Sequence, residues 1–324
     1  MIKSKQKSLE QSLPYSLLRL GLACNAKCLF CNVPPELYSL KEMLTHEAKA
    51  EIERLILLNK DIRLDITGGE PTIRKDLPGV VKYASKKSVK VIQVQTNGIL
   101  LANKEYVKSL KAAGLNKVFV GFHSQVPKIH DYLVGVNGAF ARCVKGIKNS
   151  LELGIEVILN PVITLKNYKG LPGYIKFIKR NFPQIRSISL SVVQPRGRAW
   201  INRYLVPRYG MISPYIKEAL SLGSEYKLVI NNPYCGVPFC IGGWYQYLEQ
   251  CVEYCENILK KRKISGDISV SQDKIKAAHC VECDLNKFCN GVWREYALLY
   301  HLSDLKPIRR YNGKLRLYTS NKGM

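Results

Sequence analysis

The chain has 324 residues, 46% of them hydrophobic, which is enough for one large or two ordinary domains with buried cores. Fifty Lys and Arg against 25 Asp and Glu give a net charge of +25. Such a charge would attract polyanions such as RNA, although a lysine-rich composition spread over solvated faces is the simpler explanation, because the basic residues are dispersed.

The absence of targeting signals in the sequence and the number of cysteines indicate the cellular compartment. No apolar run approaches the length of a membrane span, and residues 1–11 lack the apolar core of a secretory signal. In a chain of this kind eleven cysteines favour metal ligation in a reducing compartment over disulfides. We therefore expect a cytoplasmic protein with no membrane partner.

Short apolar strands alternate with amphipathic helices along the first two-thirds of the chain. After an N-terminal tail over 1–13, the pattern predicts strands at 15–23, 63–67, 90–96, 118–122, 156–159 and 188–193. Helices are expected between them at 46–59, 76–87, 103–113, 139–153 and 170–181. Six such strands predict an α/β fold of parallel βαβ units, too few to close an eight-stranded barrel. Polar residues end each strand, where barrel enzymes place their active sites.

The last third has a different character. A short helix is expected to begin at Ser213-Pro214 and to end near Gly223, and a strand at 227–230 opens a region with seven of the eleven cysteines. We therefore divide the chain into a tail (1–13), a barrel domain (14–231) and a small cysteine-rich domain (232–324).

A dense cysteine motif follows the first strand. Cys24, Cys28 and Cys31 form a C-x3-C-x2-C run, and three thiolates at this spacing can hold three corners of a cubane iron–sulfur cluster. No nearby cysteine supplies a fourth ligand, so one iron would stay open to a small molecule. A three-ligand zinc site is the weaker alternative, because zinc sites usually pair C-x2-C units or recruit His.

This motif, with Phe30 before its last cysteine and Gly68-Gly69-Glu70-Pro71 after the second strand, resembles the signature of radical S-adenosylmethionine (SAM) enzymes. The resemblance implies an open partial (β/α)6 TIM-like barrel and a 4Fe–4S cluster whose open iron chelates the methionyl amino and carboxylate groups of SAM. Reductive cleavage of SAM would then give a 5′-deoxyadenosyl radical that abstracts a hydrogen atom from substrate. An external electron donor of the flavodoxin or ferredoxin type is also implied.

The resemblance further implies SAM contacts at the ends of the strands. We expect them from the glycine-rich turn and from polar residues that end later strands, namely Gly68, Gly69, Glu70, Pro71, Asn97, Ser124, Asn160 and Gln194. Glu70 would offer a charge-assisted partner to the methionyl ammonium. His123 and His130 resemble a substrate-facing loop of the superfamily, although a lone loop His is more often structural. Phe30 would shield the cluster or the adenine, or pack in the core.

A second cysteine motif lies near the C-terminus. Cys280, Cys283 and Cys289 form C-x2-C-x5-C, which resembles the auxiliary-cluster motif of SPASM or twitch domains, but Trp293 stands where the full SPASM motif has a fourth cysteine. The resemblance implies a second 4Fe–4S cluster with its fourth ligand from Cys240, or else Cys235. A four-cysteine zinc site is compatible with the same spacing. Cys251 and Cys255 are expected to be packing residues, or else extra ligands.

These features predict a radical SAM enzyme whose substrate is a peptide or protein, which it would oxidise, crosslink or epimerise, because the C-terminal extension resembles those of peptide-maturing enzymes. Radical modification of RNA, suggested by the charge, or of a small metabolite is the alternative. A third interpretation is that the protein is not an enzyme but a non-catalytic, metal-stabilised binding module. The retained glycines and Glu70 argue against it.

Overall fold

A computed structural model describes residues 15–311 except 40, 59–61, 260–272 and 310. The expected tail at 1–13 lies outside the described residues. Within them, no helix has the length and apolar character needed to cross a membrane.

Seven parallel strands form the main sheet, and their spatial order follows the order of the chain. This is the arrangement that successive βα units produce, so the α/β fold expected from the sequence is confirmed. The strands are β1 (Tyr15–Arg19), β2 (Arg63–Thr67), β3 (Val91–Thr96), β4 (Lys117–Val120), β5 (Glu156–Leu159), β7 (Ser187–Ser189) and β9 (Val229–Asn231).

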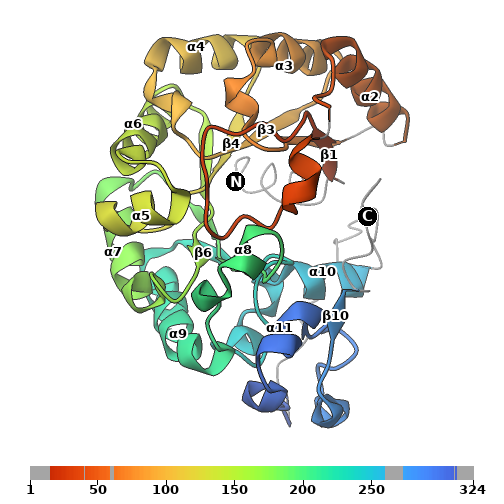
Figure 1. The fold of residues 1–324 in the computed structure, drawn as a ribbon, viewed down its shortest axis with the longest axis vertical. Coiled ribbons are helices and arrows are strands. Elements are labelled where there is room, and N and C mark those ends of the chain that lie inside the picture. The colour runs from red at the N-terminus through yellow and green to blue at the C-terminus, as the bar shows by residue number, and fades with distance from the viewer. Residues whose placement is uncertain (1–14, 40, 59–61, 260–272, 310, 312–324) are drawn as a thin grey trace, which may run out of the picture.

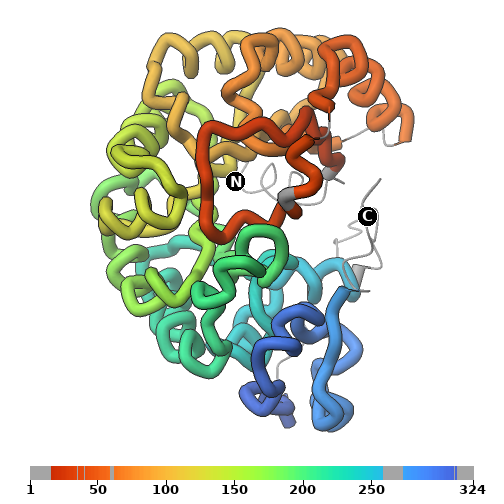
Figure 2. Tube along the Cα trace, in the orientation of Figure 1, coloured from red at the N-terminus to blue at the C-terminus, as the bar shows by residue number. Residues whose placement is uncertain are grey.

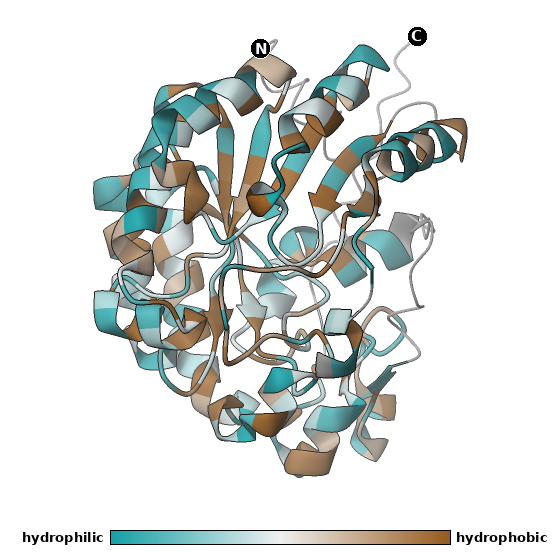
Figure 3. Cartoon of the chain, turned by 45° about the horizontal axis from the view of Figure 1, so that its top comes forward, coloured by the Kyte–Doolittle hydropathy of each residue, from teal (hydrophilic) through white to brown (hydrophobic). Residues whose placement is uncertain are grey.

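Helices cover the outer, convex side of this curved sheet (Figure 1). They turn apolar faces inward and polar faces outward, so the brown strands of Figure 3 lie behind largely teal helix surfaces. In α4, for example, Val107, Leu110 and Ala113 are buried, the Asn103 side chain caps the first turn, and Gly114 ends the helix at φ 109°. The helices of this part are α2 (Thr45–Leu58), α3 (Leu77–Lys86), α4 (Lys104–Ala113), α5 (Pro127–Val134), α6 (Ala139–Glu152), α7 (Leu171–Asn181), α8 (Arg198–Ile201) and α9 (Tyr209–Tyr226).

Two strands differ from the prediction. Six strands were predicted for the barrel pattern, but the strand expected at 227–230 joins the same sheet as a seventh, β9, paired with β7. The expected strand at 188–193 is divided at Leu190 into β7 and β8 (Ser191–Val192), and β8 pairs with β6 (Val162–Ile163) in a separate two-stranded sheet. Pro161, which has no N–H to donate, separates β5 from β6 and so interrupts the ladder at the same level.

Helix α9 also begins earlier than expected. Pro214 lies inside it rather than at its start. A tertiary contact fixes the true start, because the Tyr209 N–H donates to Tyr296 Oη at 2.9 Å and the two rings stack at 3.9 Å. No local sequence pattern predicts the contact between Tyr209 and Tyr296.

The C-terminal region packs against the end of the sheet beside β9 (Figure 1). Asn232 continues from β9, donates its N–H to Gln250 O and accepts from Val252 N, so the region is tied to the sheet through its backbone. The region contains α10 (Val252–Leu259), β10 (Lys274–Ile275), β11 (Val292–Trp293) and α11 (Arg294–Leu299), with β10 and β11 antiparallel. The division of the chain at residue 231 stays a prediction.

Short 3-10 helices occupy many of the connections. They are η1 (Pro35–Ser39), η2 (Pro71–Ile73), η3 (Leu100–Ala102), η4 (Tyr168–Gly170), η5 (Arg203–Leu205), η6 (Trp244–Gln246), η7 (Leu248–Gln250), η8 (Ala278–Glu282) and η9 (Leu302–Asp304).

Candidate functional site

The segment 20–34, which we call the cysteine loop, follows β1 and crosses the concave side of the sheet to reach α8 (Figure 2, red to green). Backbone bonds fasten it to α5, because Lys27 N donates to Val134 O and Leu29 N to Leu133 O. Near its end, Cys31 O accepts from the N–H of Ala199 at 3.3 Å. The loop therefore has a fixed path between β1, α5 and α8.

The three thiols of the loop lie at its turn, with Cys24 exposed and Cys28 and Cys31 partly buried. Burial raises the pKa of Cys28 to about 12, and the neighbouring Cys24 and Cys31 add to the rise. The guanidinium of Arg198 acts in the opposite direction on the pKa of both Cys24 and Cys28. A cation at this position favours the thiolate forms that bind iron.

Arg198 is a site residue that the sequence did not single out. Its Nη1 donates to Cys28 O at 3.4 Å, and its guanidinium stacks 4.8 Å from the ring centre of Tyr38. The hydroxyl of Tyr38 in turn donates to Cys31 Sγ at 3.5 Å. The basic run at 196–198 was the one signal available, and only the fold shows that it reaches the cysteines.

The thiols of the cysteine loop could bind either a single zinc ion or an iron–sulfur cluster. Among the described residues, no three His, Cys, Asp or Glu side chains converge as the ligands of a single metal ion. The preference for a cubane cluster over zinc here rests on the C-x3-C-x2-C spacing of the cysteines.

The glycine turn after β2 packs directly on the cysteine loop. Gly69 N donates to Gly21 O and Glu70 N donates to Ala23 O, both at 2.8 Å. A Cβ on Gly68 would lie 2.1 Å from Gly21 O, and one on Gly69 2.2 Å from Ala23 O. These glycines are therefore needed for the approach of one backbone to another, whatever they contribute to SAM.

Glu70 has a different environment from the one expected. Its residue is 2% exposed, and burial raises the pKa of its carboxyl group. Oε1 accepts from Thr72 N, from the Thr72 hydroxyl and, at 2.6 Å, from the Thr96 hydroxyl, while Oε2 accepts from Asn97 N at 2.6 Å. The carboxyl thus joins the glycine turn to the end of β3, and its expected contact with SAM stays a prediction.

The other strand-end residues are brought to one edge of the sheet, as expected of parallel strands. Two of them hold the cysteine loop, because Asn97 Nδ2 donates to Asn25 Oδ1 at 2.7 Å and Gln194 Oε1 accepts from Asn32 Nδ2 at 2.6 Å. Asn25 and Asn32 flank the cysteines and were not singled out from the sequence. Their position next to the motif cysteines is the one feature of the sequence that could have identified these two asparagines.

Ser124 and Asn160 bond within the barrel. Ser124 Oγ accepts from Val126 N at 3.0 Å just before α5, and Asn160 Nδ2 donates to Ser189 O and to Ser191 Oγ at 2.7 Å each. Pro71 is buried at the start of η2. Their expected SAM contacts stay predictions.

His123 and His130 do not form an exposed substrate loop. His130 lies within α5 and is 1% exposed, and the two rings stack at 5.6 Å. His130 Nδ1 accepts from His123 N, and His123 Nδ1 accepts from Val162 N. Burial lowers the pKa of both rings, that of His130 to about 4, so both stay neutral and serve the packing of β4 against α5. Phe30 meets the His123 ring edge to face at 4.7 Å, which is a core contact.

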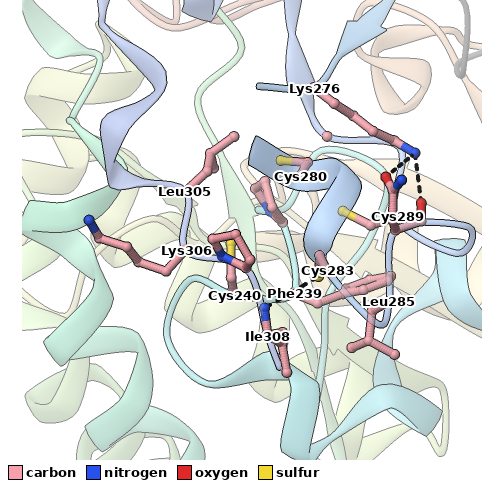
Figure 4. A pocket seen from close by; sticks show the side chains of 14 residues that line it. Phe239, Cys240, Lys276, Cys280, Cys283, Leu285, Cys289, Leu305, Lys306 and Ile308 are labelled. Carbon is pink, nitrogen blue, oxygen red and sulfur yellow. Dashed lines mark hydrogen bonds between the residues drawn. The ribbon is translucent and has the colours of Figure 1, made fainter. Parts of the chain in front are cut away.

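Four C-terminal cysteines line one small cavity of about 30 Å³ (Figure 4). They come from two separate stretches of the chain and are Cys240, Cys280, Cys283 and Cys289. Ile308 N donates to Cys283 Sγ at 3.4 Å, and Phe239, Leu285 and Leu305 add an apolar lining. Four thiols in a mainly apolar hollow are the donor set that a 4Fe–4S cluster takes.

The cavity distinguishes between the two candidates for the fourth ligand. Cys240 lines it, and the three other cysteines contribute to the raised pKa of about 12 that burial gives the Cys240 thiol. Cys235 is not among the lining residues, and its charged neighbours are instead Lys274 and Glu253. The geometry therefore supports Cys240.

The remaining cysteines lie apart from both groups. Cys251 is buried and its thiol donates to Tyr247 O at 3.6 Å, while the Cys255 thiol donates to Glu249 O at 3.4 Å. Cys143 is fully buried in α6. The positions of Cys251 and Cys255 agree with the packing role expected for these two residues.

A model of the radical SAM superfamily matches residues 18–178, which contain the cysteine loop, the glycine turn and β1 to α7. The chain belongs to the radical SAM superfamily. Proteins of this superfamily use a 4Fe–4S cluster and SAM.

Sequence relatives of this radical SAM protein align over about half of its length. A probable GTP 3′,8-cyclase of Sulfolobus acidocaldarius is 35% identical over 181 residues, 54% of this chain and 56% of the relative. The Fe-coproporphyrin III synthase of Methanosarcina barkeri is 33% identical over 194 residues, 59% of this chain and 47% of that enzyme. The chain thus spans about half the length of the curated relatives that it matches.

Solved structures match the fold over more of the radical SAM chain. Streptococcus suis SuiB bound to S-adenosylmethionine matches 94% of this chain and 79% of its own, with a TM-score of 0.60 and 15% identity. The structure of anSMEcpe with bound AdoMet matches 87% of this chain and 89% of its own, with a TM-score of 0.61 and 14% identity. At such low identity these matches establish the shared fold alone.

Proposed function

We propose that this radical SAM enzyme acts on a peptide or protein and carries two 4Fe–4S clusters. Cys24, Cys28 and Cys31 would hold the first cluster, which binds SAM. Cys240, Cys280, Cys283 and Cys289 would hold the second. The observation that carries the proposal is the C-terminal cavity, where four thiols from distant segments meet in a mainly apolar lining.

The first cluster, when reduced, supplies the electron that cleaves SAM to a 5′-deoxyadenosyl radical. The residues of the chain position it. Arg198 stabilises thiolates at Cys24 and Cys28, and the Asn97–Asn25 and Gln194–Asn32 bonds hold the two ends of the motif. The loop would thereby keep its path when SAM enters and leaves.

Support for a peptide substrate comes from the extent of the structural likeness. The match to SuiB includes the C-terminal region, and SuiB has been crystallised with the precursor peptide SuiA. The structure of anSMEcpe has likewise been determined with AdoMet and the peptide Cp18Cys. Whether the reaction is an oxidation, a crosslink or an epimerisation stays open, and so does the expected cytoplasmic location.

A small nucleotide is the second candidate substrate. The relatives named GTP 3′,8-cyclase reach 35% identity, and a net charge of +25 would attract a triphosphate as well as RNA. The alignment to the Sulfolobus acidocaldarius relative covers only about half of this chain, 54%. A non-catalytic binding module does not accord with membership of this superfamily.

The test is an anaerobic iron and sulfide count paired with detection of 5′-deoxyadenosine after chemical reduction. We expect about eight irons per chain, because two cubanes hold four each. Addition of a candidate peptide library or of GTP then shows which one raises deoxyadenosine formation above the uncoupled rate. A rise with GTP alone would replace the peptide by the nucleotide.

Single cysteine variants separate the two clusters. Cys28→Ala should abolish SAM cleavage, whereas Cys283→Ala should keep uncoupled cleavage and lose substrate turnover. Cys255→Ala, outside both groups, is the control and should keep both activities. Full SAM cleavage by Cys28→Ala would contradict the assignment of the first cluster.

A further inference from the structure

The segment 194–202, which we call the bridging segment, runs along the cysteine loop from Cys28 to Val33 (Figure 2). Hydrogen bonds of 2.6, 3.4, 3.3 and 3.0 Å join Gln194 to Asn32, Arg198 to Cys28 O, Ala199 to Cys31 O and Asn202 to Leu29 O. Gly197 adds a close approach of the two backbones, because a Cβ at this position would lie 2.4 Å from Val33 O. Two of the accepting carbonyls belong to motif cysteines, so the path of the loop between its thiols depends on the position of the bridging segment.

The side chain of Arg196, within the bridging segment, contacts the C-terminal region instead of the loop. Its Nε donates to Glu295 Oε1 at 2.6 Å, and its Nη1 donates to Asp273 Oδ2 at 3.1 Å. The guanidinium also lies 5.3 Å from the centre of the Trp293 ring. Asp273 directly precedes β10, Trp293 ends β11 and Glu295 lies in α11. Two ion pairs and a cation–π contact fix this guanidinium more firmly than a single exposed ion pair would.

The contacts of Arg196 continue to a cysteine of the C-terminal cavity. Lys274 of β10 shares the Trp293 ring with Arg196, since its Nζ lies 4.9 Å from the ring centre, and it forms an ion pair with the buried carboxylate of Glu253. The other oxygen of that carboxylate accepts, at 3.3 Å, from the backbone N–H that directly follows Cys289. These contacts form a continuous connection between the chain at Cys289 and the guanidinium of Arg196.

We propose that Arg196 is a positioning residue for the cysteine loop, and that through it the affinity for SAM depends on the C-terminal site. The C-terminal region holds Arg196, Arg196 holds the bridging segment, and the bridging segment holds the loop in the conformation that binds SAM. An arginine suits this role because its planar fork can serve two carboxylates at once, which a lysine does not match. The inference rests on the proposed function, since it requires that SAM binds at the cluster of the cysteine loop.

The experiment compares two arginines that each join the barrel to the C-terminal region. The test variant is Arg196→Gln. The matched control is Arg208→Gln, because Arg208 donates two hydrogen bonds to Asp304, at 2.9 and 3.3 Å, but lies outside the bridging segment. Equilibrium dialysis of the reconstituted full-length chain measures the dissociation constant of SAM. Electron paramagnetic resonance of the reduced protein records the change that SAM produces in the spectrum of the first cluster.

We expect Arg196→Gln to retain about eight irons per chain, to raise the dissociation constant of SAM about tenfold and to diminish the spectral change that SAM produces. The control should match wild type in all three measurements. Arg196→Lys keeps the charge but not the fork, so its dissociation constant should lie between those of wild type and Arg196→Gln. If Arg196→Gln loses iron, Glu295→Gln takes its place, because it keeps the shape of the partner, and it should weaken SAM binding in the same direction.

The variant Cys283→Ala tests the dependence on the C-terminal site. It should also raise the dissociation constant of SAM, although uncoupled cleavage persists once SAM is saturating. Combined with Arg196→Gln it should raise the constant no further than Arg196→Gln alone, because both changes remove the same coupling between the two sites.

Three results would overturn the inference. They are wild-type SAM affinity in Arg196→Gln, an equal loss in Arg208→Gln, which would mean that any tie between the two regions suffices, and effects of Arg196→Gln and Cys283→Ala that multiply in the double variant. If the reconstituted wild-type chain neither binds SAM nor changes its spectrum with it, the proposed function itself fails. Normal SAM binding by both wild type and Arg196→Gln removes the inference alone and leaves that function standing.

Discussion

Replacement of Glu70 by Gln tests whether this carboxyl group builds the site or contacts SAM. Glu70 accepts four hydrogen bonds, two of them from backbone N–H groups, those of Thr72 and Asn97. A glutamine keeps the shape but turns one acceptor oxygen into an NH₂ donor. In either orientation of the amide, one of these N–H groups then faces a donor, because Thr72 N bonds to one oxygen and Asn97 N to the other.

The size of the effect follows from those contacts. A hydrogen bond to a charged acceptor contributes about 1.5–3 kcal/mol, and removal of a buried charge offsets part of its loss. We therefore expect Glu70→Gln to lower the free energy of unfolding of the cluster-free protein by about 1–2 kcal/mol. Urea denaturation followed by circular dichroism measures this difference.

The control is Glu105→Gln, because Glu105 is exposed on α4 and pairs with Lys108 at the surface. Its loss should change the free energy of unfolding by less than about 0.5 kcal/mol. Should Glu70→Gln unfold like wild type and yet bind SAM more weakly in equilibrium dialysis, the carboxyl group contacts SAM directly and our interpretation of its network is wrong.

Two further predictions concern the second cluster and the core. Cys240→Ala should remove about four irons per chain, whereas Cys235→Ala should retain about eight, because only Cys240 lines the cavity; equal iron counts would contradict this choice of ligand. The pKa of His130, about 4, lies below that of an unfolded histidine, so the unfolded chain takes up this proton first as the pH falls. The free energy of unfolding should therefore decline by about 2 kcal/mol from this group between pH 7 and pH 5, and His130→Gln should lessen the decline by that amount in urea titrations at the two pH values.

The fold was largely predictable because its signals are local. Alternating apolar strands and amphipathic helices place six of the seven strands of the main sheet, and the Gly114 helix end occurs where expected. β9 was harder, because it is a three-residue strand whose membership depends on its pairing with β7. The start of α9 depends on Tyr296, which lies 87 residues later in the chain.

The candidate site was likewise predictable only where its residues lie close together in the sequence. Cysteine spacing identified the loop and the C-terminal motif, since ligands of one cluster often lie close in sequence. The fourth cysteine of the cavity is 40 residues from the next, and two candidates lay five residues apart, so only the fold could choose between them.

Arg198 shows why charge near a cluster is the least predictable feature. It lies 167 residues after Cys31, in a chain with 50 cationic residues, and its effect on the thiols arises because α8 returns to the cysteine loop. The same return brings Trp200, Ile201 and Arg203 to the outside of that loop. One short segment after the sixth expected strand therefore provides a cation beside the thiols and an aromatic, basic surface on the other side. A replacement in this segment can therefore alter the pKa of the cysteine thiols and the path of the loop without touching any ligand, so SAM cleavage and iron content must be measured together for every variant of residues 198–204.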